Sequence, residues 1–332
     1  MAYYKERKVN IMQDSLLRRT EQFLENRRRV ERAFRFGSPL SYCLSALLLG
    51  LNDCDADLDA LVNAKRTLKR ETGVFSPFRG LGKVPICTKL AVSDDPVLRL
   101  THMKEAQAAL KHSGFLPTDY ICLAAALMAK RQGEFDSIAK EAHRHYKGMR
   151  HIHRILTSDE DASFAVLMAM YPGSRDLIEK AEDAFSLLKS HYGSTNSTQM
   201  TSHILALADA DTDKLVLSTI WLNNTLKESG VKEHERADLP LLASLACMDC
   251  ASHETVQAIL DVEGYLSGHK CCSTMKLGRG QRLRMATALV AIDASFRCQE
   301  MPRYAAIRDG LQSAIIVTIV MSIILNASAS SV

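Results

Sequence analysis

Residues 213–248, DKLVLSTIWLNNTLKESGVKEHERADLPLLASLACM, decide the fold of this chain. The first half of the stretch carries apolar residues at helical spacing and ends with Lys227 and, three residues later, Gly230. A second and almost uninterrupted apolar run follows from residue 239 to residue 246. This pattern predicts a helix, a turn and a second helix.

The same unit recurs along the chain. Its marker is a Leu-Lys pair followed four or five residues later by glycine. At two of the six positions, Tyr146 and Leu266, the residues match this pattern only in part. Successive markers are 42, 36, 42, 38 and 40 residues apart, a period near 40. A helical hairpin cannot bury its apolar face alone, so about seven tandem hairpins must stack on one another. We therefore predict an all-α fold in which the hairpins form an α-solenoid or a closed α/α toroid. The markers begin at Leu68, Leu110, Tyr146, Leu188, Leu226 and Leu266.

The two helices of each unit are expected to differ. In residues 177–189, apolar side chains occupy one face of the first helix and charged side chains the other. Ser174 is placed to cap this helix at its start. The lysine and the glycine at its end suit the helix dipole and a left-handed C′ residue. The second helix is shorter and apolar nearly all round, so we expect it to be buried.

Composition agrees with helix packing. Of the 332 residues, 47% are hydrophobic but only 6% are aromatic, which favours a core of Leu, Ala, Ile and Met. We predict one helical-repeat domain over residues 1–332. It divides into an N-terminal hairpin (1–50), repeats (51–296) and a C-terminal capping helix with a tail (297–332). The net charge of +4 gives no reason to invoke a nucleic-acid partner.

The sequence also favours a cytoplasmic protein. Residues 1–10 are polar and charged, without the apolar segment of a secretory signal. The nine cysteines are odd in number and irregularly spaced, which is typical of reduced thiols. The apolar residues 314–325 are short for a bilayer, which needs about 20 residues, so we expect a buried terminal helix. A tail-anchored membrane protein stays open as an alternative.

Potential metal ligands occur in two places, as two His-x-His pairs and as a Cys-x-x-Cys pair. Residues two apart on a helix point about 200° apart, so neither histidine pair chelates a metal unless the helix ends between them. Cys247 continues an apolar run and is more simply a core thiol. We therefore expect no metal and no cofactor, and no P-loop, Gly-x-Ser-x-Gly or His-Glu-x-x-His motif is present. The pairs are His143 with His145, His151 with His153, and Cys247 with Cys250.

Stacked hairpins would bring the starts of all second helices to one edge. Helix N-termini attract anions, and polar residues on such an edge can bind a peptide or a small ligand. Ordinary helix capping would also place Asp and Ser there. The candidate binding residues on this edge are Arg79, Asp119, Tyr120, Asp159, Asp161 and His203, with Ser158, Asp238 and Arg282 beside them.

Four short stretches resemble a family of uncharacterised bacterial proteins, domain of unknown function 4003 (DUF4003). The resemblance extends over roughly residues 60–325, although residues 161–164 lack a Tyr-Pro pair that the family pattern would have. The resemblance implies an all-helical cytoplasmic protein without an assigned activity, and it carries no catalytic residues. The stretches are residues 76–81, 114–127, 156–159 and 202–207.

Two classes of function fit these patterns. The first is a non-enzymatic scaffold or ligand-binding protein whose partner is a protein, a peptide or a small molecule. The alternative is an α/α-toroid enzyme of unknown reaction, with Asp159, Asp161 and His203 as its acid and base groups. An enzyme would need these side chains to converge in a pocket with shifted pKa values.

Overall fold

The computed structural model describes residues 12–80, 82–171, 176–232 and 239–298. Within these residues it contains fourteen α-helices, three short 3-10 helices and no β-strand. The prediction of an all-α fold is therefore confirmed.

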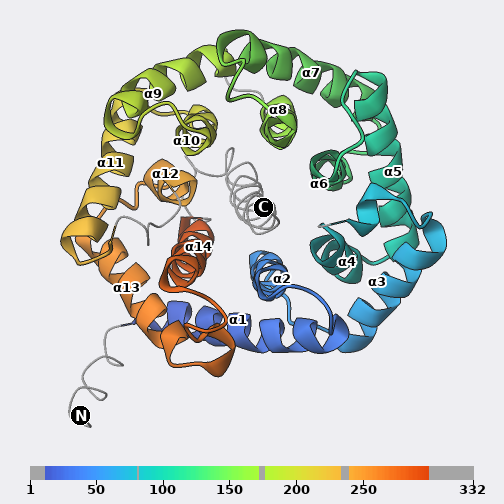
Figure 1. The fold of residues 1–332 in the computed structure, drawn as a ribbon, viewed down its shortest axis with the longest axis horizontal. Coiled ribbons are helices and arrows are strands. Elements are labelled where there is room, and N and C mark those ends of the chain that lie inside the picture. The colour runs from blue at the N-terminus through green and yellow to red at the C-terminus, as the bar shows by residue number, and fades with distance from the viewer. Residues whose placement is uncertain (1–11, 81, 172–175, 233–238, 299–332) are drawn as a thin grey trace.

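The helices lie in two concentric rings, and each hairpin contributes one helix to each ring (Figure 1). The outer ring holds α1 (Asp14–Ala33), α3 (Leu58–Glu71), α5 (Pro96–His112), α7 (Phe135–Ile152), α9 (Leu177–Tyr192), α11 (Thr212–Glu228) and α13 (His253–Ser267). The inner ring holds α2 (Pro39–Leu51), α4 (Lys83–Ala91), α6 (Asp119–Met128), α8 (Ala162–Met170), α10 (Asn196–Ala206), α12 (Leu239–Cys247) and α14 (Arg279–Arg297). The 3-10 helices are η1 (Pro77–Arg79), η2 (Asp159–Asp161) and η4 (Lys270–Cys272).

The two rings differ in burial, as their sequences predict. Every residue of α12 is buried, and in α8 all but Ala169 are buried. By contrast, α3 buries only one stripe, formed by Leu61, Ala64, Thr67 and Leu68. An apolar surface all round a helix requires neighbours on every side, so the second helix of each hairpin lies inside and the amphipathic first helix lies outside.

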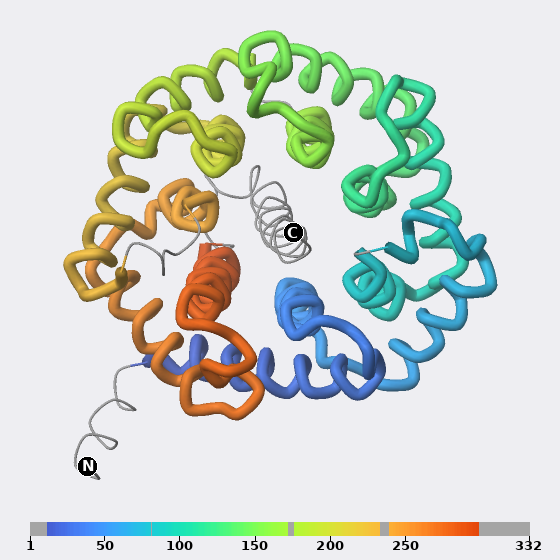
Figure 2. Tube along the Cα trace, in the orientation of Figure 1, coloured from blue at the N-terminus to red at the C-terminus, as the bar shows by residue number. Residues whose placement is uncertain are grey.

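The last described hairpin lies against the first. Helix α14 packs on both α1 and α2, and the tube trace in Figure 2 follows this return of the chain. A polar contact crosses the same seam, where Nε of Arg19 on α1 lies 3.1 Å from Oδ1 of Asp293 on α14. The ring of helices is thus joined by residues that are 274 positions apart in the sequence.

The loops that join each outer helix to its inner partner lie on one face of the ring, which we call the hairpin face. Neighbouring loops meet there. Ser163 Oγ lies 3.5 Å from the Tyr120 carbonyl oxygen, and Asn196 Nδ2 donates to Glu160 Oε1 at 2.6 Å. The starts of α6, α8 and α10 are therefore side by side.

The loops that join each inner helix to the next outer helix lie on the opposite face, which we call the linker face. Here Nη1 of Arg99, in the first turn of α5, donates to the carbonyl oxygen of Ala129 at the end of α6 (3.0 Å). Arg131 Nη2, just beyond α6, donates to the carbonyl oxygen of Met170 at the end of α8 (3.2 Å). Arg99 therefore ties the two helices of one hairpin together, and Arg131 ties that hairpin to the next.

The glycine after an outer helix is predicted to have a left-handed φ, and most but not all of the marker glycines do. Gly114, Gly193 and Gly230 have φ of 108°, 74° and 89°, so the prediction of a left-handed residue after the outer helix is confirmed at these three. It is wrong at Gly73, whose φ lies outside that region. The predicted cap Ser174 lies outside the described residues, and the side chain of Asp176 caps α9.

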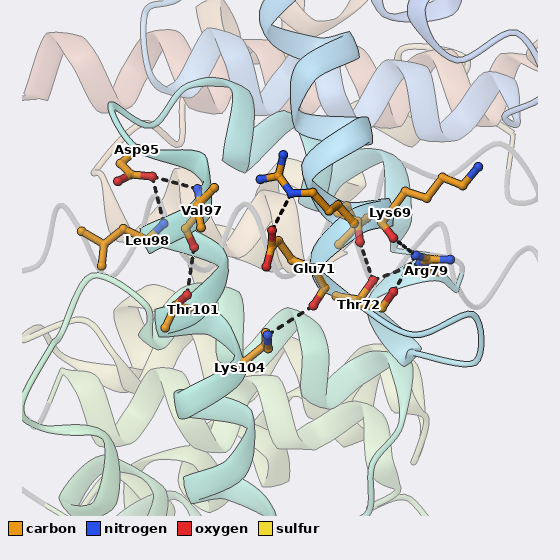
Figure 3. A network of polar contacts seen from close by, with 11 residues as sticks. Lys69, Glu71, Thr72, Arg79, Asp95, Val97, Leu98, Thr101 and Lys104 are labelled. Atoms are coloured by element: carbon orange, nitrogen blue, oxygen red, sulfur yellow. Dashed lines mark hydrogen bonds and ion pairs between the residues drawn. The ribbon is translucent and has the colours of Figure 1, made fainter.

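Arg79 explains the exception at Gly73. Its guanidinium donates to the carbonyl oxygens of Lys69 and Thr72 and to the Thr72 hydroxyl, at the end of α3 (Figure 3). A side chain thereby satisfies the final carbonyl groups of α3. Gly73 is therefore not needed in the left-handed conformation that would let backbone N–H groups bond these carbonyls.

The C-terminal part of the predicted domain is largely outside the description. Of the capping helix and tail expected at 297–332, only Arg297 and Cys298 are described. Among the described residues, no helix combines the length and the apolar character needed to cross a bilayer.

Candidate functional site

Two of the predicted site residues form a buried pair. Asp161 ends η2, and its Oδ2 accepts a hydrogen bond from the Ser158 backbone N–H at 2.9 Å. Its Oδ1 lies 3.8 Å from Nδ1 of His203 on α10, and each of the two side chains is only 3% exposed. The prediction that His203 lies at the start of its helix is wrong, because Thr195 caps α10 and the helix begins at Asn196.

The environment of this pair favours neutral side chains. Burial raises the pKa of Asp161 to about 7 and lowers the pKa of His203 to about 3. The separation of 3.8 Å falls within the range of an ion pair, but desolvation disfavours both charged forms and outweighs the attraction. Nδ1 of His203 has no hydrogen-bond partner among the described residues. Asp161 and His203 thus form a neutral polar contact inside the wall between α8 and α10.

Other predicted residues gather close to this pair. Asp119 and Tyr120 begin α6, and the pKa of Tyr120 is raised by burial and then by the carboxylates of Glu160, Asp119 and Asp159. Glu160 was missed at the sequence level although it is buried and bonded to Asn196. The hairpin-face ends of α6 and α8 therefore carry a group of carboxylates, which does not suit an anionic ligand.

The two predicted arginines lie apart from this group. Arg79 is committed to the end of α3, as described above. Arg282 is buried in the last hairpin, where its Nε donates to Glu263 at 2.8 Å and its Nη1 donates to the Leu277 carbonyl oxygen at 2.9 Å. Asp238 lies outside the described residues. The structure thus brings together Asp119, Tyr120, Asp159, Asp161 and His203, and it separates the arginines from them.

A different site opens on the linker face. A cavity of about 630 Å³ lies where the C-terminal ends of α2, α4, α6 and α8 meet the start of α5. Among the described residues that line it are four cationic side chains and one carboxylate. The polar lining residues are Asn52, Lys89, Ser93, Asp94, Arg99, Lys130, Arg131 and Tyr171.

The two arginines of the cavity are held in place by the backbone. Arg99 and Arg131 each donate one N–H to a carbonyl oxygen at a helix end, and the Arg131 guanidinium lies 5.6 Å from the centre of the Tyr171 ring. Cations are expected at such helix ends, which carry partial negative charge. A guanidinium has five N–H donors, so each arginine keeps further donors for a ligand.

The two lysines of the cavity have no such partner. Neither Lys89 nor Lys130 makes a hydrogen bond or an ion pair with any of the described residues. Burial lowers the pKa of Lys89 to about 8, and the nearby charges of Lys130 and Arg99 contribute to the same shift. Arg131 has an acidic neighbour, since its Nη1 lies 3.8 Å from Oε1 of Glu134, but the charges of Lys89 and Lys130 are not paired within the described residues.

A signal for this site exists in the sequence. Lys89 and Lys130 are 41 residues apart, which is one repeat period, and each lies at the end of a predicted second helix. The predicted binding edge, by contrast, contained only residues expected at the starts of those helices. Basic residues at equivalent positions of adjacent hairpins would have pointed to the opposite edge.

Within the described residues, no group of three His, Cys, Asp or Glu side chains is arranged to hold a metal ion. His145 is buried in α7, while Nε2 of His153 lies 2.7 Å from Oε2 of Glu182 and the His153 ring packs at a tilt against the Phe185 ring. These histidines serve as packing and polar contacts between outer helices.

The fold and the cavity define an all-helical protein with a cationic pocket between successive hairpins. The family model described as "Protein of unknown function (DUF4003)" matches residues 28–324, nearly the whole chain. The chain therefore belongs to this family, as the four short stretches suggested. No curated protein and no solved structure matches it.

Proposed function

We propose that the chain is a non-enzymatic α/α toroid that binds a small anionic molecule in the cavity on the linker face. The observation that carries this proposal is the presence of Lys89 and Lys130, two lysines without a partner among the described residues, on a cavity of about 630 Å³. That volume lies within the range of small-molecule sites, roughly 300–1,000 Å³.

Charge supports an anion over a neutral ligand. Among the described residues, four cations line the cavity and Asp94 is the one carboxylate beside them. The helix ends nearby supply some negative potential, but their carbonyl groups are already bonded by Arg99 and Arg131. A ligand with one or more carboxylate or phosphate groups would relieve the repulsion that lowers the pKa of Lys89.

The repeat organisation supports the toroid. The marker period near 40 implies stacked hairpins, and a closed array needs the last hairpin to pack on the first, as α14 does on α1 and α2. We also propose a cytoplasmic location, on the grounds of the sequence expectations. The enzyme alternative is less favoured because the Asp161 and His203 side chains, at 3% exposure, offer no surface to a substrate.

The test is a titration of the purified chain by calorimetry with citrate, ribose 5-phosphate and inorganic phosphate as probes. We expect at least one multivalent anion to bind. Replacing two charged donors with apolar groups, in Lys89→Met with Lys130→Met, should weaken that binding at least about tenfold. The matched control is Lys140→Met, an exposed lysine on α7 away from the cavity, which should leave the affinity unchanged.

Two results would reject the proposal. One is the absence of binding by all three anions at low ionic strength. The other is equal affinity in the wild type and the double variant, which would place the anion elsewhere on the surface. Circular dichroism of each variant establishes that it is folded before the titration is interpreted.

A further inference from the structure

The loops of the hairpin face carry large apolar side chains that are mostly or fully exposed. Phe36, Phe75, Ile155 and Met275 are each at least 97% exposed. Leu116 occupies the equivalent loop of the third hairpin and is 64% exposed. We call these five side chains the apolar tips.

Their distribution is not the scatter expected of surface residues. A single exposed apolar residue is ordinary on a protein surface. The apolar tips, however, occur in the loops of five different hairpins, after α1, α3, α5, α7 and α13. Of the two remaining loops, the one after α9 (residues 193–195) is polar, and the one after α11 is only partly described. Because the tips lie on one face and contribute little to the core, their role lies outside the folded chain.

Exposed cations are next in sequence to three of the apolar tips and lie at the end of the preceding helix for the other two, while Asp119 and Asp159 are partly exposed acids on this face. The cations suit the C-terminal ends of the outer helices, which would attract them in any case. The helix dipole does not explain why a fully exposed apolar residue follows them. The half-buried acids Glu31 and Glu71, in the last turns of α1 and α3, are paired with Arg27 at 2.9 Å and Arg70 at 2.6 Å, and Glu31 also lies 4.0 Å from Lys276. The exposed cations include Arg35, Lys69, Lys111, Arg154 and Lys276.

The loops of the linker face differ in charge from the loops of the hairpin face. Outside the cationic cavity described above, the linker loops are rich in aspartate. Such a difference in charge orients a protein in front of a charged surface. Exposed aspartates on these loops include Asp53, Asp55, Asp57, Asp94, Asp95 and Asp211.

We propose that the hairpin face docks on the surface of an anionic lipid bilayer, with the apolar tips in the interfacial region and the flanking cations against lipid phosphates. A bilayer fits this arrangement because its surface is extended and fluid, and it can receive several separate apolar points at once. Its anionic leaflet attracts each nearby lysine or arginine. This peripheral contact differs from the tail anchor considered at the sequence level, and it does not depend on residues 314–325.

The experiment is co-sedimentation of the full chain with two kinds of vesicle, phosphatidylcholine alone and phosphatidylcholine mixed with phosphatidylserine. We expect binding to the mixed vesicles and little binding to the neutral ones. A tip variant combines Phe36→Ser, Phe75→Ser, Ile155→Ser and Met275→Ser. Losing four interfacial apolar groups should lower its partition coefficient at least about tenfold.

A matched control and a charge variant sharpen the comparison. Leu98→Ser with Leu217→Ser removes two exposed apolar residues that lie outside the hairpin loops, on α5 and α11, and should bind as the wild type does. Arg35→Gln with Lys111→Gln and Arg154→Gln should bind several-fold more weakly, and the binding of the wild type should weaken as salt is raised.

The proposal is overturned if the wild type ignores mixed vesicles or if the tip variant still binds them. It is also overturned if analytical ultracentrifugation shows that the tips hold two copies of the chain together while vesicles do not bind. Because the tips are exposed, the tip variant should fold, and circular dichroism of the variant provides an independent check that it has done so.

Discussion

At the scale of single residues, burial decides which charges this protein carries. Asp161 and His203 would attract each other as ions, yet both are buried so completely that their neutral forms are favoured. Burial also disfavours the charged form of Lys89, and the positive charges of Lys130 and Arg99 lower its pKa further. The pair is closed to solvent, whereas the lysine borders a cavity, so only the lysine is available to a ligand.

The Asp161 carboxyl should make stability depend on pH. Its pKa is raised from 3.8 to about 7 in the folded state, so its contribution is fully present below pH 4 and is lost as pH rises toward 7. Asp161→Asn keeps the acceptor for Ser158 but does not titrate. The variant should therefore gain stability relative to the wild type between pH 4.5 and pH 8, by about 2–4 kcal/mol.

Urea denaturation at the two pH values measures this difference. His203 acts in the opposite direction, because its depressed pKa gives stability that is present above pH 6.5 and lost as pH falls toward 3. Comparing Asp161→Asn with the wild type cancels the His203 contribution, because His203 is present in both proteins.

Asp159→Asn changes a half-exposed neighbour of Asp161 and serves as the control. It should change the unfolding free energy by less than about 0.5 kcal/mol. A stability difference that is the same at both pH values would show that Asp161 is ionised throughout.

Lys89 should link anion binding to pH. With a pKa lowered to about 8, the side chain is charged below that value and increasingly neutral above it. The affinity for an anion should fall as pH rises from 7 to 9, by about threefold to tenfold for one lost charge. Calorimetric titration across this range measures the slope. Lys89→Met should remove most of this pH dependence of the affinity. An unchanged dependence in the variant would show that another group titrates.

At the scale of single elements, two different devices end the outer helices. Gly114, with φ of 108°, ends α5 in the left-handed region, and a Cβ added there would lie 2.8 Å from the His143 ring. Gly73 follows α3 without a left-handed φ and has open space around it. The guanidinium of Arg79 does the capping there. Glycines at equivalent positions of the repeat thus differ: the end of α5 requires the left-handed φ of Gly114, whereas the end of α3 does not require glycine at position 73.

Alanine at these two glycines tests the difference. Gly114→Ala should lower the unfolding free energy by about 1–3 kcal/mol, through backbone strain and the contact with His143. Gly73→Ala should be neutral or stabilising by up to about 1 kcal/mol, because alanine narrows the unfolded ensemble without strain. Thermal denaturation of both variants measures the two effects. Equal losses at both positions would contradict the assignment of Arg79 as the cap of α3.

At the scale of the whole molecule, the last described hairpin packs on the first. In an open array each repeat contacts only its neighbours, and the ends can unravel separately. Here the first and last hairpins share a seam. Arg19 contacts the buried Asp293 and lies over the Phe296 ring, with the guanidinium carbon 3.9 Å from the ring centre. The seam therefore couples both ends of the described chain.

Arg19→Met should weaken this coupling. Removing one partner leaves Asp293 buried with only Arg297 beside it, so we expect a loss of about 2–4 kcal/mol. The matched control is Arg28→Met on the same helix. Arg28 pairs with Glu25 at the surface, and its loss should cost less than about 1 kcal/mol. Denaturant unfolding followed by the fluorescence of Trp221, far from the seam in sequence, shows whether the whole ring responds. No difference between the two variants would mean that the seam is not a stabilising contact.

The amino-acid sequence alone was sufficient for the helices, their pairing into hairpins and the burial of the second helix in each pair. These properties depend on residues within one repeat, where apolar periodicity and turn glycines act over short distances. The prediction of a left-handed φ failed at Gly73 because the side chain of Arg79 caps α3 in its place. A contact made by a side chain from the following loop cannot be predicted from the spacing of lysine and glycine.

Only the tertiary structure decided how the hairpins face one another. The contact of Asp161 with His203, the cavity shared by α2, α4, α6 and α8, and the seam between Arg19 and Asp293 each join different hairpins. The physical reason is that stacking fixes the rotation of each hairpin against the next, and this rotation follows from packing over the whole core. The same is true of the apolar tips, since a phenylalanine in a loop can fold inward or stand in solvent, and at Phe36 and Phe75 the packed core leaves it outside.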